Sequence, residues 1–507
     1  MGKRGILCIF ALEKVTIFML QTDIPAEFAA KMRELPELDA EALLKALSSE
    51  PCVGVRLNNR KMPAPDTLGY DLAGSVTWCE DGYYLPQRPL FTLNPSLHAG
   101  GFYVQDPSSM IHQQVVGRIV AANGHVPMTL LDFCAAPGGK TTAMINALPD
   151  GSVAVANEYV PTRGKILREN LEKWGYPAVI TTGAAASDYA GLPEMFDIIA
   201  VDAPCSGEGM MRKDEEARRQ WTPRLVEECA ALQRDILSNI VSTLRPGGYL
   251  IYSTCTFNPE EDELNSRFIR DELGLEPVSA DNLGLSGIEN VGRSLLPDVE
   301  ALRFMPHLTR GEGLYLSVFR KPGKLLPYLE NEGAPSPTDR HLPEKPKDKS
   351  KGKQKGKQER NPSFALTDEH RRRLDEWYAP DWDMQFEQNG NLITALPAIA
   401  SRPLAILRQG GVRVTGAGLP AAELKGRDLI PDSRIVLSSA ISPDAFPKVA
   451  LTEEDALRYL RRDAIQLPEG TPKGYVAVTC NGLPLGLMKN IGNRANNLFP
   501  APWRIRI

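Results

Sequence analysis

Short apolar runs alternate with amphipathic segments through the middle of the chain, from residue 101 to residue 322. The apolar runs have the length of buried strands, and the segments between them repeat their apolar residues with helical spacing. The expected strands cover residues 130–133, 153–158, 196–204, 247–255 and 313–322. Strands that alternate with helices predict an α/β fold with a doubly wound parallel sheet, whose ligands lie at the carboxyl ends of the strands.

The residues before this region follow a different pattern. Residues 23–50 show helical periodicity, and residues 52–95 read as short strands among Gly, Pro and aromatic turns. Together they predict a small α+β unit at residues 19–100. The stretch QDPSSM then predicts a helix start, with Asp106 or Ser108 as the cap and Pro107 in the first turn.

The last third of the chain begins with a change in composition. Residues 323–361 are rich in Lys, Pro and Gly, which predicts a flexible linker or, alternatively, an electrostatic RNA tether. Residues 362–507 predict a separate domain of short strands with one clear helix at 452–465. Asn481-Gly482 predicts a hairpin turn, and the Arg- and Asn-rich tail is equally compatible with a closing strand and with an RNA surface.

Composition narrows the class of protein. A chain of 507 residues predicts two or three domains, and the absence of a long apolar run argues against a membrane protein. A net charge of -5 argues against wholesale coating by nucleic acid. The eight dispersed cysteines form no CxxC pair, which predicts reduced cytoplasmic thiols and no metal site. Glu13 and Lys14 interrupt a signal-like start, which argues against export. Because Met19 begins a cleaner amphipathic segment, residues 1–18 are a candidate upstream extension.

The stretch LDFCAAPGGKTT resembles a phosphate-binding loop but lacks its first glycine, because position 134 is Cys134. Such a turn still offers backbone N–H groups to an anion. Glu158 follows Gly139 by nineteen residues, the distance at which an acid binds ribose hydroxyls. The pattern favours S-adenosylmethionine, with N–H groups from Ala136 to Lys140 at its carboxylate, although a purely structural turn is also compatible.

Two cysteines carry the candidate chemistry. Cys205 in DAPCSGEG and Cys255 in STCTFNPEE each follow a predicted strand, so both are expected to face one crevice. A thiolate that adds to carbon 6 of cytosine makes carbon 5 nucleophilic toward a methyl donor, and the second thiol can assist release. Asp202 could bind the base or orient the donor, and Lys140 could lower a thiolate pKa or touch the base. The target base must leave its stack to reach these groups.

These motifs, with the upstream FYVQDPSSM and LRPGGYLIYSTCTFNPEED, resemble the Nol1/Nop2/Sun family of RNA cytosine methyltransferases, which make 5-methylcytosine. The approach PSLHAGGFYVQDPSSM and the C-terminal GLPLGLMKNIGNRANNLFPAPWRIRI resemble its RsmF-like bacterial branch, which acts on 16S ribosomal RNA. The resemblance covers roughly residues 20–322 and the C-terminal part. It implies a Rossmann-like core at 101–322, an RNA-binding unit at 19–100 and a PUA-like domain at 362–507.

The resemblance also implies the role of each site residue. Cys255 becomes the nucleophile and Cys205 the release residue, with Glu158 on the ribose and Asp202 as the motif acid. The implied S-adenosylmethionine-binding residues are Cys134, Ala135, Ala136, Pro137, Gly138, Gly139, Lys140, Glu158 and Asp202. Ala184 lies where relatives often carry an adenine-binding acid and Asp188 comes four residues later, so neither is assigned this role.

Several hypotheses stay open from sequence alone. Arg212 and Lys213 are compatible with RNA phosphate contacts or with a solvated helix start, whereas Cys134 and Cys229 are expected to pack. The main expectation is a cytoplasmic, monomeric enzyme that methylates cytosine in ribosomal RNA. The alternatives are a noncatalytic RNA-binding assembly factor that keeps the fold and an NTPase or RNA chaperone.

Overall fold

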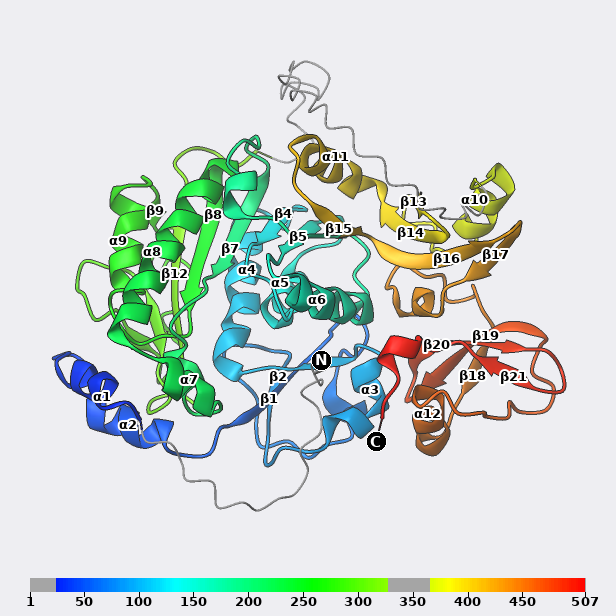
Figure 1. Cartoon of the computed structure of the whole chain (residues 1–507), viewed down its shortest axis with the longest axis horizontal. Helices are drawn as coiled ribbons and strands as arrows, with labels where there is room; N and C mark the ends of the chain where they lie inside the picture. The colour runs from blue at the N-terminus through cyan, green and yellow to red at the C-terminus, as the bar shows by residue number, and fades with distance from the viewer. Residues whose placement is uncertain (1–23, 327–364, 507) are drawn as a thin grey trace, which may run out of the picture.

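The computed structural model describes residues 24–326 and 365–506, and its centre is one large mixed sheet (Figure 1). In sheet order the path contains β10 (Gly292–Arg293), β11 (Leu302–Phe304), β12 (Leu314–Arg320), β8 (Leu244–Thr254), β7 (Phe196–Asp202), β4 (Thr129–Asp132), β5 (Val153–Asn157), β6 (Val179–Thr182) and β15 (Val414–Ala417). A tenth strand, β9 (Glu276–Pro277), pairs with β12. The five strands from β8 to β6 are parallel, which confirms the predicted α/β core.

Helices cover both faces of this sheet, as a doubly wound fold requires. One face packs on α4 (Ile111–Ala122), α5 (Gly139–Ala147) and α6 (Pro161–Trp174), and the other on α8 (Pro223–Ile240), α9 (Glu263–Asp271) and α11 (Ser401–Gln409). Successive residues of β4 illustrate the alternation, since Leu130 belongs to the first apolar cluster and Leu131 to the second. Both strand faces are buried, which explains the nearly continuous apolar runs in the sequence.

The edge strand β15 comes from the C-terminal part of the chain. It pairs antiparallel with β6, and Leu404 and Leu407 of the preceding helix α11 enter the apolar cluster of the core. Part of the stretch predicted as a separate domain at 362–507 therefore completes the large sheet. The predicted linker at 323–361 lies almost entirely outside the described residues, as does the candidate extension at 1–18.

The N-terminal part contains two short helices and a three-stranded antiparallel sheet, in agreement with the predicted α+β unit. These are α1 (Ala26–Arg33), α2 (Ala40–Leu47), β1 (Val53–Leu57), β2 (Gly82–Leu85), β3 (Phe102–Val104) and the helix α3 (Pro95–His98). The helix start predicted at QDPSSM is a 3-10 turn at Pro107–Met110 that leads into α4. The side chain of Asp106 does not cap this turn, because its Oδ1 accepts a hydrogen bond from the N–H of Glu312.

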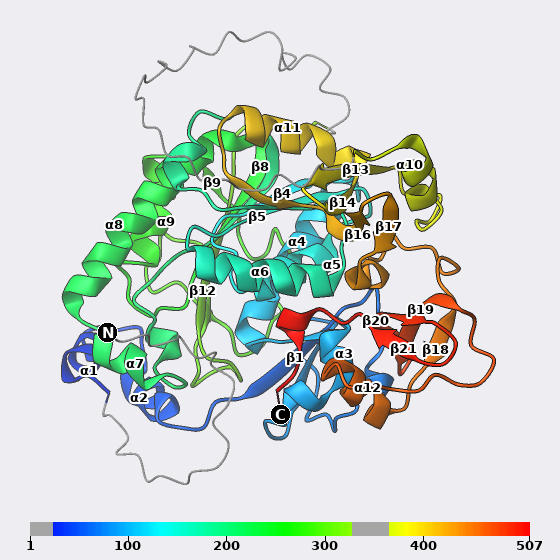
Figure 2. The same cartoon turned by 45° about the vertical axis from the view of Figure 1, so that its right-hand side comes forward.

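Two four-stranded sheets form the C-terminal part (Figure 2). The first contains β13 (Met384–Asn389), β14 (Leu392–Pro397), β16 (Leu419–Lys425) and β17 (Asp428–Pro431), and the second contains β18 (Lys448–Ala450), β19 (Gly474–Cys480), β20 (Leu483–Asn490) and β21 (Ala495–Asn497). Short helices α7 (Glu215–Gln220), α10 (Asp368–Asp375) and α12 (Glu453–Leu460) complete the described elements. Asn481 and Gly482 form the predicted turn between β19 and β20, both with positive φ.

The C-terminal sheets are packed against the rest of the molecule. Val449 and Val478 share one apolar cluster with Val55 of the N-terminal sheet. The ammonium of Lys173 on α6 lies 4.9 Å from the ring centroid of Trp503 in the tail. No helix within residues 24–326 and 365–506 combines the length and apolar character that a membrane crossing needs.

Candidate active site

The candidate site lies where the strand order reverses. β4 pairs with β5 on one side and β7 on the other, so the chain winds outward from β4 in both directions. In open α/β sheets the crevice at such a switch point binds ligands at the carboxyl ends of the strands. The four strands β4, β5, β7 and β8 end next to the predicted site residues.

The turn from Cys134 to Lys140 joins β4 to α5. Its shape depends on Gly138, which has a φ of +110° and would place a Cβ 3.3 Å from Leu167. Gly138 is also the residue before α5, and no side chain among the described residues caps the helix there. The first N–H groups of α5 are therefore directed toward the end of the sheet, in the arrangement that binds an anion.

The turn is held from its carbonyl side. Arg163 donates to the carbonyl of Ala136 at 2.9 Å, and Asn170 donates to that of Pro137 at 2.8 Å. Arg56 on β1 donates to the carbonyl of Gly139 and to the hydroxyl of Thr142. These bonds fix the backbone without using its N–H groups, which fits a turn that serves an anionic ligand.

Glu158 follows β5, and its side chain is 5% exposed. Its Oε1 accepts the N–H of Val160 at 2.8 Å, while Oε2 lies 3.6 Å from the guanidinium of Arg163. The preceding residue, Asn157, donates to the carbonyls of Phe133 and Ala184 and ties together the ends of three strands. No pattern in the sequence indicated this role for Asn157.

The region after β6 shows why no adenine-binding acid was assigned. Ala184 is buried, and its N–H donates to Asn157. Asp188 is exposed and accepts the N–H of Ala185 at 2.9 Å, so its carboxylate stabilises its own loop. Among the described residues, no side-chain hydrogen bond or ion pair joins Ala184 or Asp188 to the turn from Cys134 to Lys140.

The two predicted cysteines meet. The Sγ atoms of Cys205 and Cys255 lie 3.2 Å apart, and both side chains are half-buried. The hydrogen bond to Cys255, together with burial, raises the pKa of Cys205 well above its usual range.

Lys140 and Asp202 connect the donor turn to the cysteine loops. Lys140 Nζ lies 2.8 Å from Asp202 Oδ2, and Ser253 donates to Oδ1 at 3.0 Å. Burial disfavours the charged lysine, but the charge and hydrogen bond of Asp202, with a further contribution from Cys255, raise the pKa of Lys140 to about 12. Lys140 is thus a fixed cation between the two halves of the site.

His112 on α4 contacts Ser253, which in turn donates to Asp202 of this ion pair. Its Nε2 lies 3.1 Å from the hydroxyl oxygen of Ser253, and its Nδ1 lies 3.0 Å from the carbonyl oxygen of Ser109. Burial and the charge of Lys140 lower the pKa of His112 to about 4, so the ring is neutral near pH 7. His112 and Ser253 were missed as supporting residues, although Ser253 stands two positions before Cys255 in the motif.

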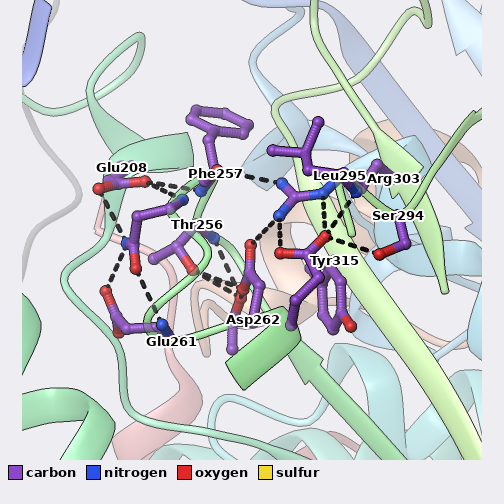
Figure 3. Close-up of polar contacts among 12 residues, drawn as sticks. Glu208, Thr256, Phe257, Glu261, Asp262, Ser294, Leu295, Arg303 and Tyr315 are labelled. Atoms are coloured by element: carbon purple, nitrogen blue, oxygen red, sulfur yellow. Dashed lines mark hydrogen bonds and ion pairs between the residues drawn. The ribbon is translucent and has the colours of Figure 1, made fainter. Parts of the chain in front are cut away.

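Three buried acids, Glu208, Glu261 and Asp262, contact the segments that follow Cys205 and Cys255 (Figure 3). Asp262 accepts the hydroxyls of Thr254 and Thr256, which flank Cys255. Arg303 pairs with Asp262 at 3.1 Å and also with Glu263, and it neutralises part of this acidic cluster. Burial raises the pKa of Asp262 well above its usual range.

The other residues singled out in the sequence differ in their burial and contacts. The side chain of Arg212 is 6% exposed and pairs with Glu312 at 3.0 Å, so its guanidinium is not displayed to a phosphate. Lys213 lies 3.6 Å from the same carboxylate and is 31% exposed. Cys134 packs at the turn, where burial raises its pKa well above the usual range, whereas Cys229 on α8 is only half-buried.

Three family models match successive parts of the chain. The model described as 16S rRNA methyltransferase RsmB/F matches residues 121–320. The N-terminal domain of 16S rRNA methyltransferase RsmF matches residues 24–107, and the methyltransferase RsmF PUA domain matches residues 446–505.

Individual relatives agree with these models. The chain is 30% identical over 495 residues to ribosomal RNA small subunit methyltransferase F of Escherichia coli K12, which covers 94% of this chain and 95% of the relative. A Shigella flexneri protein, the putative ribosomal RNA small subunit methyltransferase F, is 30% identical over 493 residues with the same coverage. The crystal structure of PH0851 has a TM-score of 0.53 at 21% identity and covers 59% of this chain and 66% of its own, a likeness of fold. The chain therefore belongs to the RsmF family of ribosomal RNA small subunit methyltransferases.

Proposed function

We propose that the protein transfers a methyl group from S-adenosylmethionine to carbon 5 of a cytosine in small-subunit ribosomal RNA. The observation that carries the proposal is the pair of thiols, Cys205 and Cys255, with sulfurs 3.2 Å apart at the ends of β7 and β8. The ion pair between Lys140 and Asp202 joins this pair to the turn that precedes α5. Methylation through a covalent base adduct needs a nucleophile beside the methyl donor, and a second thiol can assist release of the adduct.

The donor fits the residues that surround the end of β4 and β5. The uncapped N–H groups at the start of α5 would hold its carboxylate, and Glu158 would hold its ribose hydroxyls. When bound, S-adenosylmethionine supplies an electrophilic methyl group on a sulfonium. Cys134, Ala135, Ala136, Pro137, Gly138 and Gly139 contribute backbone, and Lys140 and Asp202 close the side that faces the base.

Cys255 acts as the nucleophile in this proposal. Its thiolate forms a bond to carbon 6 of the flipped cytosine, and the electron pair moves toward the ring nitrogen and carbon 5. The fixed cation of Lys140 stabilises the charge that develops on the ring, and Asp202 accepts a hydrogen bond from the exocyclic amine. Carbon 5 then takes the methyl group and still carries its hydrogen.

Cys205 completes the reaction. Once Cys255 is bonded to carbon 6, its sulfur no longer accepts the hydrogen bond that is the main cause of the raised pKa of Cys205. Cys205 can then give its proton to water and take the hydrogen of carbon 5 as a proton. The electron pair of that C–H bond reforms the double bond, and Cys255 leaves as a thiolate. One proton is released for each methyl group transferred.

We propose that ribosomal RNA of the small subunit is the substrate and that the N-terminal unit and the PUA domain bind it, a proposal that the family membership supports. We propose that the domains follow the division 19–100, 101–322 and 362–507, and that the protein works as a cytoplasmic monomer. β15 and α11 show that the third division also supplies an edge of the catalytic sheet.

Denaturing gels of reactions with small-subunit ribosomal RNA and S-adenosylmethionine test the roles of the cysteines. Cys205→Ala is expected to accumulate an RNA-protein adduct, because release fails, and Cys255→Ala is expected to form none. Cys229→Ala, which alters a half-buried cysteine outside the site, is the matched control and should behave like the unmodified protein. No adduct with Cys205→Ala, together with no methyl transfer by the unmodified protein, would leave the noncatalytic assembly factor as the better hypothesis.

A further inference from the structure

The loop that carries Cys205 is bonded to the loop that carries Cys255 by a buried acid. Glu208 has no exposed surface, and its Oε2 accepts the N–H groups of Phe257 at 2.6 Å and Asn258 at 3.1 Å. Both donors lie just beyond Cys255 in the chain. Figure 3 shows Glu208 and Phe257 in this contact. The acid of the first loop thus binds the backbone of the second.

A second acid makes the same contact in the opposite direction. Glu261, from the second loop, accepts the N–H of Ser206 at 3.0 Å and also its hydroxyl. Ser206 directly follows Cys205. The side chain of Asn258 donates to both acids, at 2.9 Å to Glu208 and 2.8 Å to Glu261, and joins the two contacts into one unit. We call Glu208, Glu261, Asn258 and Ser206 the loop clasp.

The loop clasp has a direct connection to the nucleophile. The N–H of Gly209, next to Glu208, donates to the carbonyl of Cys255 at 2.7 Å. Each bond of the loop clasp therefore has at least one end within three residues of Cys205 or Cys255. The bond from Gly209 ends on Cys255 itself. A shift of either loop would change the separation of the two sulfurs.

Burial of two carboxylates in this position costs free energy, because it disfavours their charged form. Burial, together with the nearby charge of Glu261, raises the pKa of Glu208 to about 7. Burial likewise raises the pKa of Glu261. A neutral amide of nearly the same shape would avoid this cost, but it has one oxygen in place of two. With that oxygen on the backbone N–H groups, its NH₂ group would face the side-chain donors Trp221 Nε1 and Asn258 Nδ2, which now contact Oε1 of Glu208. A carboxylate is the side chain that accepts from several N–H groups at once.

We infer that Glu208 and Glu261 are positioning residues, which hold Cys205 at the distance from Cys255 that the release step needs. The inference rests on the proposed cytosine methylation, because release by Cys205 is part of that reaction. Neither acid needs to touch the substrate. The two acids act through the backbone of the cysteine loops.

The sharpest consequence concerns the fate of the covalent adduct. In Glu208→Gln and Glu261→Gln, both cysteines remain, and Cys255 can still attack the base. Because Cys205 is displaced, release is expected to slow more than attack. Both variants should therefore accumulate the RNA adduct with native cysteines, at least threefold above the unmodified protein, with a lower kcat and an unchanged KM for RNA. A merely structural loss of folded protein would lower adduct and turnover together.

The control variants separate the possible failures. Glu228→Gln alters an exposed acid on α8 that pairs with Arg224, and it should not accumulate adduct. Cys205→Ala is the positive control, and its failure to form adduct would count against the proposed function itself. Adduct with Cys205→Ala but none above background with both Gln variants would overturn the positioning role.

A second measurement does not depend on methylation. Diamide oxidises two neighbouring thiols to a disulfide, while two electrons and two protons pass to its azo group. With sulfurs 3.2 Å apart, the Cys205–Cys255 disulfide should form rapidly in the unmodified protein and about tenfold more slowly in the Gln variants. Peptide mass spectrometry identifies the cross-link. Equal rates in all proteins would contradict the inference.

Ser206→Ala keeps the test decisive if the Gln variants do not fold. It removes only the hydroxyl bond to Glu261 and leaves the backbone N–H of residue 206 in place. A smaller slowing of cross-linking, about threefold, is expected together with a detectable increase in adduct. An unchanged rate in this variant, with the Gln variants unfolded, would also reject the positioning role.

Discussion

The candidate site has two halves: the turn from Cys134 to Lys140 with Glu158, proposed to bind the methyl donor (the donor half), and the loops that carry Cys205 and Cys255 (the cysteine half). These halves are held in place by groups of opposite charge. On the donor side, segment 56–61 of the N-terminal unit provides cations that bind carbonyl oxygens. Arg56 contacts the first turn of α5, Arg60 donates to carbonyls at its last turn, and Lys61 donates to the carbonyl of Lys173 near the end of α6. On the cysteine side, carboxylates bind N–H groups and hydroxyls.

The difference follows from the backbone group that each half must leave free. The donor side presents N–H groups to an anion, so its supports bind carbonyls, and cations suit the ends of helices where carbonyls collect. The cysteine side presents thiols, and its loops leave backbone N–H groups that need acceptors. The donor half is supported by a distant N-terminal segment, whereas the acids of the cysteine half come from its own two loops, with Arg303 of β11 paired to Asp262.

Loss of the ion pair between Lys140 and Asp202, which joins the two halves, should have the largest effect on kcat. Lys140→Met removes the cation that lies 2.8 Å from Asp202 and leaves that carboxylate without its charged partner. We expect kcat for methyl transfer to fall about 10²-fold to 10³-fold, because charge on the ring is no longer stabilised. Initial rates with ribosomal RNA and labelled donor measure this loss.

Lys324→Met removes an exposed lysine after β12 and is the matched control, expected to retain full activity. Binding of the donor, measured by calorimetry, should change much less than kcat in Lys140→Met. A variant that lost donor affinity but kept kcat at saturating donor would place Lys140 in the donor half alone.

Sequence reasoning was sufficient for features that one segment determines. The turn around Gly138 and the acid Glu158 follow from local spacing, and the strand ends predicted before Cys205 and Cys255 brought both thiols together. The family resemblance, confirmed by the comparisons, added the assignment of roles. Those roles themselves stay predictions.

Features that depend on contacts between distant segments were not accessible in this way. Glu208 and Glu261 stand inside recognised motifs, yet their partners lie about fifty residues away, so only the folded chain shows what they bind. Arg212 was compatible with an RNA phosphate contact or with a solvated helix start, because nothing local reveals its burial against Glu312. The pairing of β15 with β6 joins residues more than two hundred positions apart.

The cationic support of the donor half can be tested with Arg56→Met. Arg56 has no exposed surface, lies 4.7 Å from the ring centroid of Trp174 and donates to Thr142 at 2.6 Å. Methionine keeps much of the packing but removes the guanidinium that donates to the carbonyl of Gly139 and the hydroxyl of Thr142. We expect the Kd for S-adenosylmethionine to rise about tenfold, or about 1.4 kcal/mol.

Calorimetric titration of the donor measures this change, and Arg88→Met, an exposed arginine in the same N-terminal unit, is the control. Diamide cross-linking of Cys205 to Cys255 should be unaffected in Arg56→Met, because the cysteine half has its own supports. Slower cross-linking in this variant would show that the two halves do not depend on separate supports.

The smallest expected effect is a pH dependence of opposite sign in the two halves. Burial lowers the pKa of Lys61 from 10.5 to about 7. Below pH 7 the folded and unfolded states both hold the proton, and the cost of burying the charge is present in full. As pH rises from 7 toward 10.5, the unfolded state keeps the proton and the folded state loses it, so Lys61 becomes less destabilising. For Glu208, whose pKa is raised from 4.5 to about 7, stability is instead lost as pH rises from 4.5 to 7.

Urea denaturation of the unmodified protein and of Lys61→Met at pH 7 and pH 8 tests this sign. Part of the Lys61 side chain is exposed to solvent, so we expect the free energy of unfolding of the unmodified protein to gain about 0.5 kcal/mol over Lys61→Met in that interval. Lys45→Met, which alters an exposed lysine on α2, should show no such gain. Between pH 5 and pH 7 the difference between the unmodified protein and Glu208→Gln should move the other way. Slopes of the same sign for Lys61 and Glu208 would contradict the division of the site into a half supported by cations and a half supported by acids.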